Sequence, residues 1–472
     1  MIITRFAPSP TGYIHIGNLR AAIPPYLVAR QTGGKFLLRI EDTDQARFVE
    51  DATDLILSTL TTLGLDWDGE PIFQTSRYDI YHKYARELIE KGRAYADPTP
   101  PETIAKYREE DSAAKKPFLY RNHRPESSPE WEPGIPLRFR AEPKTYEYHD
   151  EVMGDLTAGP ETQDDFILIK ADGLPTYNFA HIIDDTEMNI NLVCRGVEYL
   201  PSMGNYLALY DALGIERPTF AHMPHILGPT GNKKLGKRDG AKSATEYFDE
   251  GILPEAMLNF LITLGWNDGT EQEIYSRDDL IKVFKLSDMQ RSSARFDEGK
   301  LLWLNGQWIR RLYEQNPEDL YHRTHNFWPD SAASYEDDYK KAVLAIIYDR
   351  LKTLSDLKSF TAYFFADPTI DLEMITSNKF LSTFSELELI NLLQTTQSAL
   401  EDITDWQPDQ IQTTLNNLLE QTRLKPAQLF SLIRIALSFA PFSPDLAATM
   451  SVLGKPTVLA RLSSVIGSLS AD

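Results

Sequence analysis

The sequence predicts an α/β protein in which a parallel-sheet domain is split by an insertion and followed by an all-α region. Three observations favour this architecture. Short apolar runs alternate with helix-length segments over the first hundred residues, as in parallel sheets. Prolines and charged residues cluster from about residue 97 to 142, and helical patterns dominate from about residue 244 to the end.

The strands are predicted from short β-rich runs. Residues 2–6 form one run, and residues 36–40 form another that ends in the acidic string 41–44. Similar runs return at residues 166–170 and 190–194, after the Pro-rich stretch. Aromatic side chains within that stretch indicate an inserted subdomain with its own contacts instead of a linker.

The helices are predicted from apolar spacing and end signals. One helix is expected between Ser76 and Gly92, with a capping box formed by Ser76 and Asp79. A later apolar face is expected to belong to one helix of the C-terminal region. Its members are Val343, Ile346, Ile347, Leu351 and Leu354.

Length and composition exclude several classes of protein. The 472 residues predict about three domains at roughly 150 residues each. The 42% hydrophobic and 25% charged contents are those of a globular protein and exclude wholesale disorder. The net charge of −21 argues against a non-specific nucleic-acid coat, although an acidic enzyme can still carry a local basic patch.

The single cysteine, Cys194, excludes an intramolecular disulfide and a Cys-rich zinc site. The chain shows neither a signal-like apolar segment at its start nor a run of about 18 apolar residues. We therefore expect a cytoplasmic protein without a membrane partner.

The segment from Ala7 to Asn18 is the first candidate for chemistry. It follows a predicted strand and precedes a helix, the place where phosphates meet free helix N–H groups. Gly12 and Gly17 would let a nucleotide approach the backbone, and His15 could donate a hydrogen bond to a phosphate. The alternative is a Pro/Gly-rich turn with a surface histidine.

The loop at residues 231–240 is the second candidate. Glycines bound it, and four of the six residues from Lys233 to Arg238 are cations. Such a loop can bring ammonium groups onto a polyphosphate. The alternative is a solvated basic turn.

The two segments together resemble the HIGH and KMSKS signatures of class I aminoacyl-tRNA synthetases. Here they read His15-Ile-Gly-Asn18 and Lys234-Leu-Gly-Lys-Arg238. Further stretches resemble glutamyl-tRNA synthetases in order along the chain. They are residues 5–12, 39–44, 175–180, 193–196 and 296–306.

The resemblance implies a Rossmann-type catalytic domain with a connective insertion, followed by helical tRNA-reading domains. It divides the chain into five segments. These are 1–95 and 176–244 (the two catalytic halves), 96–175 (an insertion binding the acceptor end), 245–318 (a helical stem-contact domain) and 319–472 (an α-helical anticodon-binding domain).

The implied activity is glutamate–tRNA ligation. L-Glutamate would be activated with ATP to glutamyl-adenylate and transferred to the 3′ end of tRNA-Glu. The attacking carboxylate is already an anion, so positioning and charge stabilisation suffice without a protein base. Mg²⁺ would accompany ATP, held mainly by phosphates and water. No zinc or other protein-bound metal is expected.

The resemblance also implies site residues. Arg5 and Arg195 would bind carboxylates of glutamate, with Arg5 on the side-chain carboxylate, and Glu41 would hold the ammonium. The expected sets are Arg5, Ala7, Ser9, Glu41, Tyr177 and Arg195 for glutamate; Pro8, Gly12, His15, Gly17, Asn18 and Lys237 for ATP; His15, Lys234 and Lys237 for catalysis; and Arg350 for tRNA. Ordinary alternatives are a strand-end acid for Glu41, a core residue for Tyr177 and a solvated helix arginine for Arg350.

The chain departs from the family pattern at several positions. Asn18 replaces a histidine, Gly236 a serine, and Val197 stands where many relatives have an acid. Pro24 and Pro25 predict a kinked or interrupted first helix, because proline deletes a backbone hydrogen bond.

Several alternatives stay open. The enzyme could also charge tRNA-Gln, or the chain could be a small-molecule nucleotidylyltransferase or a non-catalytic tRNA-binding paralogue. We expect a monomer whose tRNA partner meets a positive strip on an acidic body. The strip would draw on Lys282, Lys285, Arg291, Arg295, Lys300, Arg310, Arg311 and Arg350.

Overall fold

The computed structural model describes residues 1–231, 233–235, 242–440 and 443–470. The chain divides into two compact units. The first comprises Met1–Phe248 and Pro254–Glu298, and the second comprises Asp249–Leu253 and Gly299–Asp472. Within the described ranges, no helix has the length and apolar character needed to cross a membrane.

Two sets of strands form the centre of the first unit. In one set β1 (Ile3–Phe6), β2 (Lys35–Ile40) and β3 (Ile72–Phe73) are parallel, in the order β1-β2-β3. In the other the order is β7-β6-β10-β9. These strands are β6 (Tyr146–Asp150), β7 (Gly154–Ala158), β9 (Leu192–Gly196) and β10 (Thr219–Met223). β10 is parallel to β6 and β9, and β7 is antiparallel to β6.

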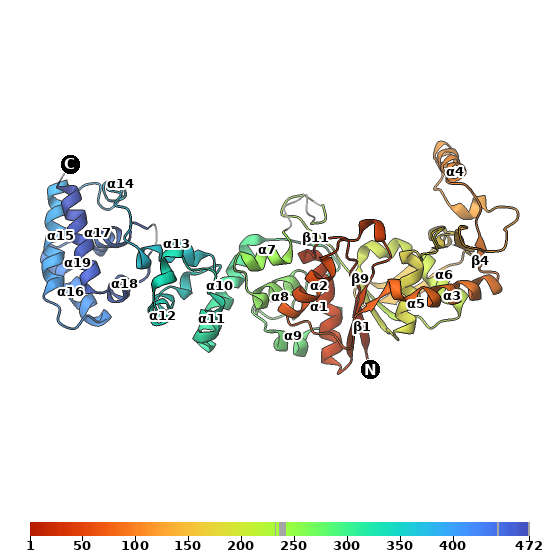
Figure 1. Cartoon of the computed structure of the whole chain (residues 1–472), viewed down its shortest axis with the longest axis horizontal. Coiled ribbons are helices and arrows are strands. Elements are labelled where there is room, and N and C mark those ends of the chain that lie inside the picture. Colours follow the sequence, from red (N-terminus) through yellow and green to blue (C-terminus); the bar gives the residue numbers. More distant parts are fainter. Residues whose placement is uncertain (232, 236–241, 441–442, 471–472) are drawn as a thin grey trace. The chain divides into compact units, whose positions relative to one another are not determined.

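β1 and β9 join the two sets. The backbone N–H of Ile3 donates to Asn191 Oδ1 at 2.8 Å, and the backbone N–H of Asn191 donates to the carbonyl of Ile3 at 3.1 Å. Figure 1 shows the two strands side by side. The strand order reverses direction at this junction, and in open α/β sheets such a switch point is where ligands bind.

Helices cover the strands of the first unit. α1 (Ile16–Gln31) packs on β1, and α5 (Tyr177–Glu187) contacts α3 (Tyr78–Glu90). The others are α2 (Ala52–Thr62), α6 (Met203–Leu213), α7 (Ala244–Asp249), α8 (Pro254–Thr263) and α9 (Arg277–Val283). A short parallel pair, β11 (Ile226–Leu227) with β12 (Ala294–Arg295), completes it.

The predicted insertion carries its own small sheet. β4 (Ala94–Ala96), β5 (Leu137–Phe139) and β8 (Ile167–Ile169) are antiparallel, and α4 (Pro101–Ala113) has no buried residue. β6 also comes from this part of the chain, yet it pairs with β10 through Asp150 and Phe220. The insertion therefore contributes a strand to the central sheet.

The second unit consists of helices around an apolar core. The core includes Leu393, Leu415, Leu432 and Leu462, all fully buried. The helices are α10 (Glu298–Gln315), α11 (Pro317–Arg323), α12 (Asp337–Ala345), α13 (Asp356–Phe365), α14 (Glu373–Thr376), α15 (Glu386–Glu401), α16 (Pro408–Thr422), α17 (Pro426–Ser438), α18 (Leu446–Leu453) and α19 (Lys455–Leu469).

The predicted fold class is confirmed: a parallel-sheet domain precedes a helical region. Each predicted strand is present with slightly different bounds. The division into five segments stays a prediction, since contacts within the chain separate only two units.

Three local predictions are wrong. The predicted interruption of the first helix is absent, since α1 continues through Pro24 and Pro25; both prolines are buried, and the Thr4 hydroxyl of β1 donates to the carbonyl of Pro25 at 2.8 Å. Ser76 caps no helix. Its hydroxyl donates to the carbonyl of Phe73, and α3 begins at Tyr78.

The third wrong local prediction is the single helix expected to carry the apolar face from Val343 to Leu354. α12 ends at Ala345, and a 3₁₀ turn, η9 (Tyr348–Arg350), follows. Four of the five residues are buried, so the apolar pattern reports burial correctly although it spans more than one element.

Candidate active site

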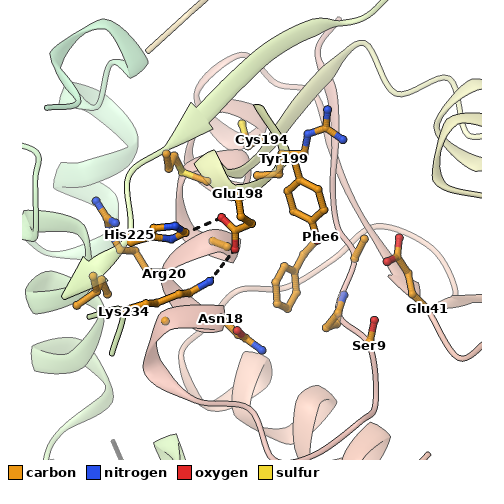
Figure 2. Close-up of a pocket in the computed structure, with 18 of the residues that line it drawn as sticks. Phe6, Ser9, Asn18, Arg20, Glu41, Cys194, Glu198, Tyr199, His225 and Lys234 are labelled. Atoms are coloured by element: carbon orange, nitrogen blue, oxygen red, sulfur yellow. Dashed lines mark hydrogen bonds and ion pairs between the residues drawn. The ribbon is translucent and has the colours of Figure 1, made fainter. Parts of the chain in front are cut away.

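A cavity of about 270 Å³ lies at the carboxyl ends of β1, β2, β9 and β10. Figure 2 shows its lining, with Lys234 and His225 at one end and Glu41 at the other. The sequence-predicted site residues that line it are Arg5, Ala7, Pro8, Ser9, Gly17, Asn18, Glu41, Tyr177, Arg195 and Lys234. Segments that are far apart in sequence thus meet at the switch point of the sheet.

Arg5 is anchored by a buried carboxylate. Its Nε and Nη2 donate to the two oxygens of Asp185 at 2.9 and 3.2 Å, and its Nη1 donates to the carbonyl of Cys194 at 3.1 Å. Burial opposes the charge, but Asp185 outweighs it and raises the pKa of Arg5. Arg5 therefore stays protonated, and N–H hydrogens on Nη1 and Nη2 are left over for a ligand.

Arg195 has neutral partners. Its Nε donates to His222 Nε2 at 3.0 Å, its Nη1 lies 3.2 Å from His181 Nε2, and its Nη2 lies 2.9 Å from the Met203 sulfur. The side chain is 5% exposed. Among the residues that the structure describes, none offers Arg195 a carboxylate within 4.0 Å.

Glu41 follows β2 and keeps one carboxylate oxygen available. Its Oε1 accepts from Nη2 of the buried Arg39 at 2.9 Å, whereas no described residue hydrogen-bonds to its Oε2. Burial raises the pKa of Glu41 above its ordinary value, and the neighbouring Arg39 only partly offsets this. Oε2 can accept a hydrogen bond from a cationic group in the cavity.

Tyr177 opens α5 and lines the cavity through its ring. The ring stacks on His181 with centroids 4.8 Å apart and on Tyr199 with centroids 5.4 Å apart. Burial, together with Glu41, raises the pKa of Tyr177 well above its ordinary value, so the hydroxyl stays neutral. Cys194 also lines the cavity, but burial raises the pKa of its thiol to about 12, which makes it a poor nucleophile.

His15 forms the N-cap of α1. Its Nδ1 accepts a hydrogen bond from the backbone N–H of Gly17 at 3.1 Å, an arrangement that places the proton of a neutral imidazole on Nε2. Gly17 fits tightly here, because a Cβ added to it would lie 2.9 Å from His15 Cε1. Gly17 and Asn18 line the cavity, whereas Gly12 and His15 are not among its lining residues.

Lys234 enters the cavity from the basic loop. Its ammonium lies 2.6 Å from Glu198 Oε1, and His225 Nδ1 lies 3.6 Å from Glu198 Oε2. Figure 2 shows both contacts. Burial acts to raise the pKa of Glu198, but Lys234 outweighs it and the pKa is lowered. Gly236 and Lys237, the other predicted features of this loop, lie outside the described residues.

Several lining residues were not predicted from the sequence, among them Glu198, Tyr199, His225 and Arg20. Val197 stands where an acid was expected, yet the next residue, Glu198, places a carboxylate in the cavity. The buried Arg20 of α1 donates to the carbonyls of Pro224 and Leu264 at 2.5 and 2.6 Å. Burial lowers the pKa of Arg20 to about 10.

Arg350 lies in η9 of the second unit and is exposed on the 3₁₀ turn. Its Nε is 4.0 Å from Asp349 Oδ1, and Tyr348, in the same 3₁₀ turn, stacks on Tyr313 with centroids 3.8 Å apart. In the part of the chain that the structure describes, no group of three or more His, Cys, Asp or Glu side chains is arranged to hold a metal ion.

Two family models match the chain. The model described as "tRNA synthetases class I (E and Q), catalytic domain" matches residues 1–303, and "Anticodon binding domain" matches residues 319–466. The fold and the cavity are therefore those of a class I tRNA synthetase.

Individual relatives narrow this class. The chain is 38% identical to glutamate–tRNA ligase 1 of Alkalilimnicola ehrlichii, covering 98% of each chain. It is 39% identical to glutamate–tRNA ligase 1 of Syntrophus aciditrophicus, covering 98% of this chain and 97% of that one. A crystal structure of a glutamate tRNA ligase from Elizabethkingia meningosepticum, in complex with its amino acid, superposes with a TM-score of 0.88 at 31% identity over 99% of each chain. The chain belongs to the glutamate–tRNA ligase family.

Proposed function

We propose that the protein activates L-glutamate with ATP to glutamyl-adenylate and transfers the glutamyl group to the 3′ end of tRNA-Glu. The observation that carries this proposal is the pair of buried arginines at the switch point. Arg5 and Arg195 line one cavity, and each guanidinium keeps N–H hydrogens for which the described residues supply no partner. Two cations suit an amino acid with two carboxylates.

In the glutamate subsite, Arg5 and Arg195 bind the carboxylates and Glu41 accepts from the ammonium. The spare Oε2 of Glu41 supports this role. The Tyr177 hydroxyl, the Ser9 hydroxyl and the backbone at Ala7 complete the subsite, since all three residues line the same cavity. This subsite has two positive groups and one negative group, opposite in sign to zwitterionic glutamate.

In the ATP subsite, α1 presents its N-terminus with Gly17 and Asn18, after the turn that contains Pro8 and Gly12. His15 donates from Nε2 to a phosphate oxygen, a role that its Nδ1 contact with Gly17 supports. Lys234 exchanges Glu198 for the phosphates when ATP binds, and Lys237 joins it. Mg²⁺ enters with ATP as part of the substrate, coordinated by phosphate and water oxygens.

The first step needs no protein base, because the attacking carboxylate is already an anion. A carboxylate oxygen of glutamate attacks the α-phosphorus of ATP and pyrophosphate leaves. The terminal ribose hydroxyl of tRNA then attacks the carbonyl of the mixed anhydride, the bond to the phosphate breaks, and AMP leaves with the hydroxyl proton on its phosphate. The side chains hold the reactants in line and stabilise the charge that develops on phosphate.

We assign tRNA contact to Arg350, whose exposed position on η9 leaves its guanidinium accessible. The match of residues 319–466 to an anticodon-binding domain supports this assignment. We further propose that the enzyme acts as a monomer in the cytoplasm, where ATP, glutamate and tRNA occur together.

ATP–pyrophosphate exchange by the purified full-length chain tests the proposal. We expect exchange that depends on glutamate and is supported by tRNA-Glu, followed by glutamyl transfer to that tRNA. A nucleotidylyltransferase would exchange without glutamate, and a binding paralogue would not exchange; either result would overturn the proposal. Parallel reactions with tRNA-Gln measure how strongly the enzyme discriminates between tRNA-Glu and tRNA-Gln.

A further inference from the structure

Arg195 differs from Arg5 and Arg39 in the charge of its partners. Arg5 and Arg39 both contact Asp185, at 2.9 and 2.6 Å, so each has an anion as its partner. Arg195 instead contacts two imidazoles and a thioether. The rings of Tyr206 and Tyr199 lie 4.8 and 5.1 Å from its guanidinium carbon and add neutral cation–π contacts.

The far side of each imidazole fixes its tautomer. His181 Nδ1 lies 2.8 Å from the carbonyl of Tyr177, which can only accept, so this nitrogen must carry a proton. His222 Nδ1 lies 2.6 Å from the carboxylate of Asp150, which is fully buried, and so must also donate. In each ring the remaining Nε2 lone pair is then directed at Arg195.

Both imidazoles are neutral in this environment. Burial and the charge of Arg195 lower the pKa of His181 to about 3. Burial also lowers the pKa of His222, although its hydrogen bond to Asp150 opposes this. Asp150 contacts both the backbone N–H and the ring of His222, so the ring has little freedom to turn.

We propose that His181 and His222 are positioning residues that orient the Arg195 guanidinium without neutralising it, and so reserve its charge for a carboxylate of the bound amino acid. The inference rests on the proposed function, because it concerns how the same cavity selects its substrate. The chain could have held Arg195 with a carboxylate, as it holds Arg5. A carboxylate would compete with the substrate, whereas an imidazole lone pair does not.

This arrangement favours glutamate over glutamine. A bound glutamate supplies the anion that Arg195 lacks inside the protein. Glutamine keeps its α-carboxylate, so this preference requires that Arg195 contacts the side-chain carboxylate of glutamate. The neutral side-chain amide of glutamine would then leave the buried cation without a counter-charge, which is costly in a site built for a charged group. Removing an imidazole lone pair would let the guanidinium turn and would weaken this preference.

Aminoacylation kinetics of the full-length enzyme with tRNA-Glu provide the test. We expect His181→Phe and His222→Phe each to raise KM for glutamate by about ten- to a hundredfold, the scale of a lost hydrogen bond to a charged group, with KM for ATP unchanged. The ratio of kcat/KM for glutamate to kcat/KM for glutamine should fall in the same variants. His181→Gln and His222→Gln, whose amide oxygens can still accept, should recover most of the loss. His149→Gln, on an exposed part of β6, is the matched control and should behave as the parent enzyme.

A second measurement reports the tautomers of the two rings directly. Nitrogen-15 NMR of histidine-labelled enzyme should show two rings that are neutral at physiological pH and carry their proton on Nδ1, identified by their loss in the glutamine variants. Rings protonated on Nε2, or charged rings, would overturn the inference. So would phenylalanine variants that keep the KM for glutamate and the preference over glutamine. If instead the parent enzyme fails to activate glutamate, the proposed function itself fails.

Discussion

Asp185 accepts from both Arg5 and Arg39: its Oδ1 lies 2.9 Å from Arg5 Nε and 2.6 Å from Arg39 Nη1. All three side chains are buried, and the carboxylate comes from α5 whereas the arginines come from β1 and β2. The group therefore fastens the helix that carries Tyr177 and His181 to the two strands beside the cavity.

Asp185→Asn tests this fastening. Burial acts to raise the pKa of Asp185, but Arg5 and Arg39 outweigh it and hold the pKa well below its usual range. The stabilisation is thus present above the unfolded-state pKa of about 3.9 and is lost as pH falls through the lower folded-state value. Near neutral pH we expect the variant to lose about 3–5 kcal/mol of unfolding free energy.

Chemical denaturation at neutral pH and near pH 3 measures both the loss of unfolding free energy and its dependence on pH. The difference between variant and parent should shrink in acid. Asp155→Asn, at an exposed site on β7, is the control and should change stability little. A difference that stayed constant in acid would show that the charge of Asp185 is not what stabilises the pair of strands.

Arg195→Gln tests the role of the unpaired cation in substrate binding. We expect KM for glutamate to rise by at least about tenfold, because a charge-assisted contact to a carboxylate is removed. KM for ATP should change little, since Arg195 lies among the predicted glutamate residues. Arg47→Gln, at an exposed position, serves as the control in the same steady-state assay. An equal rise in both KM values would instead indicate general damage to the cavity.

We expect protonation of Glu41 to limit glutamate binding at low pH. Because burial raises its pKa, Glu41 becomes protonated at a higher pH than an ordinary glutamate, whose pKa is about 4.3. Protonation removes the acceptor for the substrate ammonium, so kcat/KM for glutamate should fall on the acid side before ordinary carboxyls titrate. We expect this acid limb to disappear in Glu41→Gln, which should have low activity throughout. An unchanged acid limb in that variant would assign the titration to another group.

Gly17→Ala tests the position of His15. The added methyl would lie 2.9 Å from Cε1 and 3.0 Å from Nδ1 of the imidazole, so the ring must move. We expect kcat to fall by about tenfold to a hundredfold, the scale of a displaced hydrogen-bond donor to the reacting phosphate. Gly467→Ala on α19 is the matched control, because a methyl there meets nothing within 4 Å. Equal activity of the two variants would argue against a role for His15 in the reaction.

The sequence could predict the features that depend on local pattern. The β-rich runs at residues 2–6 and 190–194 predicted the strands that carry Arg5 and Arg195. The turn after β1 drew attention to Gly12, His15 and Gly17, of which Gly17 lines the cavity. The family resemblance added Glu41 and Tyr177, which no local signal distinguishes from a strand-end acid and a core aromatic.

The partners of these residues could not be predicted, because they depend on which strands lie side by side. The parallel pairing of β9 with β10 places His222 opposite Arg195, and the pairing of β10 with β6 brings Asp150 to the same ring. No spacing along the chain encodes those contacts. The sequence also predicted an interruption at Pro24 and Pro25, whereas α1 continues there, packed on β1 with both prolines buried.

A crystal structure of the enzyme soaked with glutamate tests the central claim most directly. We predict that carboxylate oxygens of the bound amino acid lie at about 2.7–3.0 Å from guanidinium nitrogens of both Arg5 and Arg195, with the ammonium on Glu41. A glutamate bound in this cavity with no carboxylate on Arg195, or glutamate bound only elsewhere on the chain, would contradict the claim.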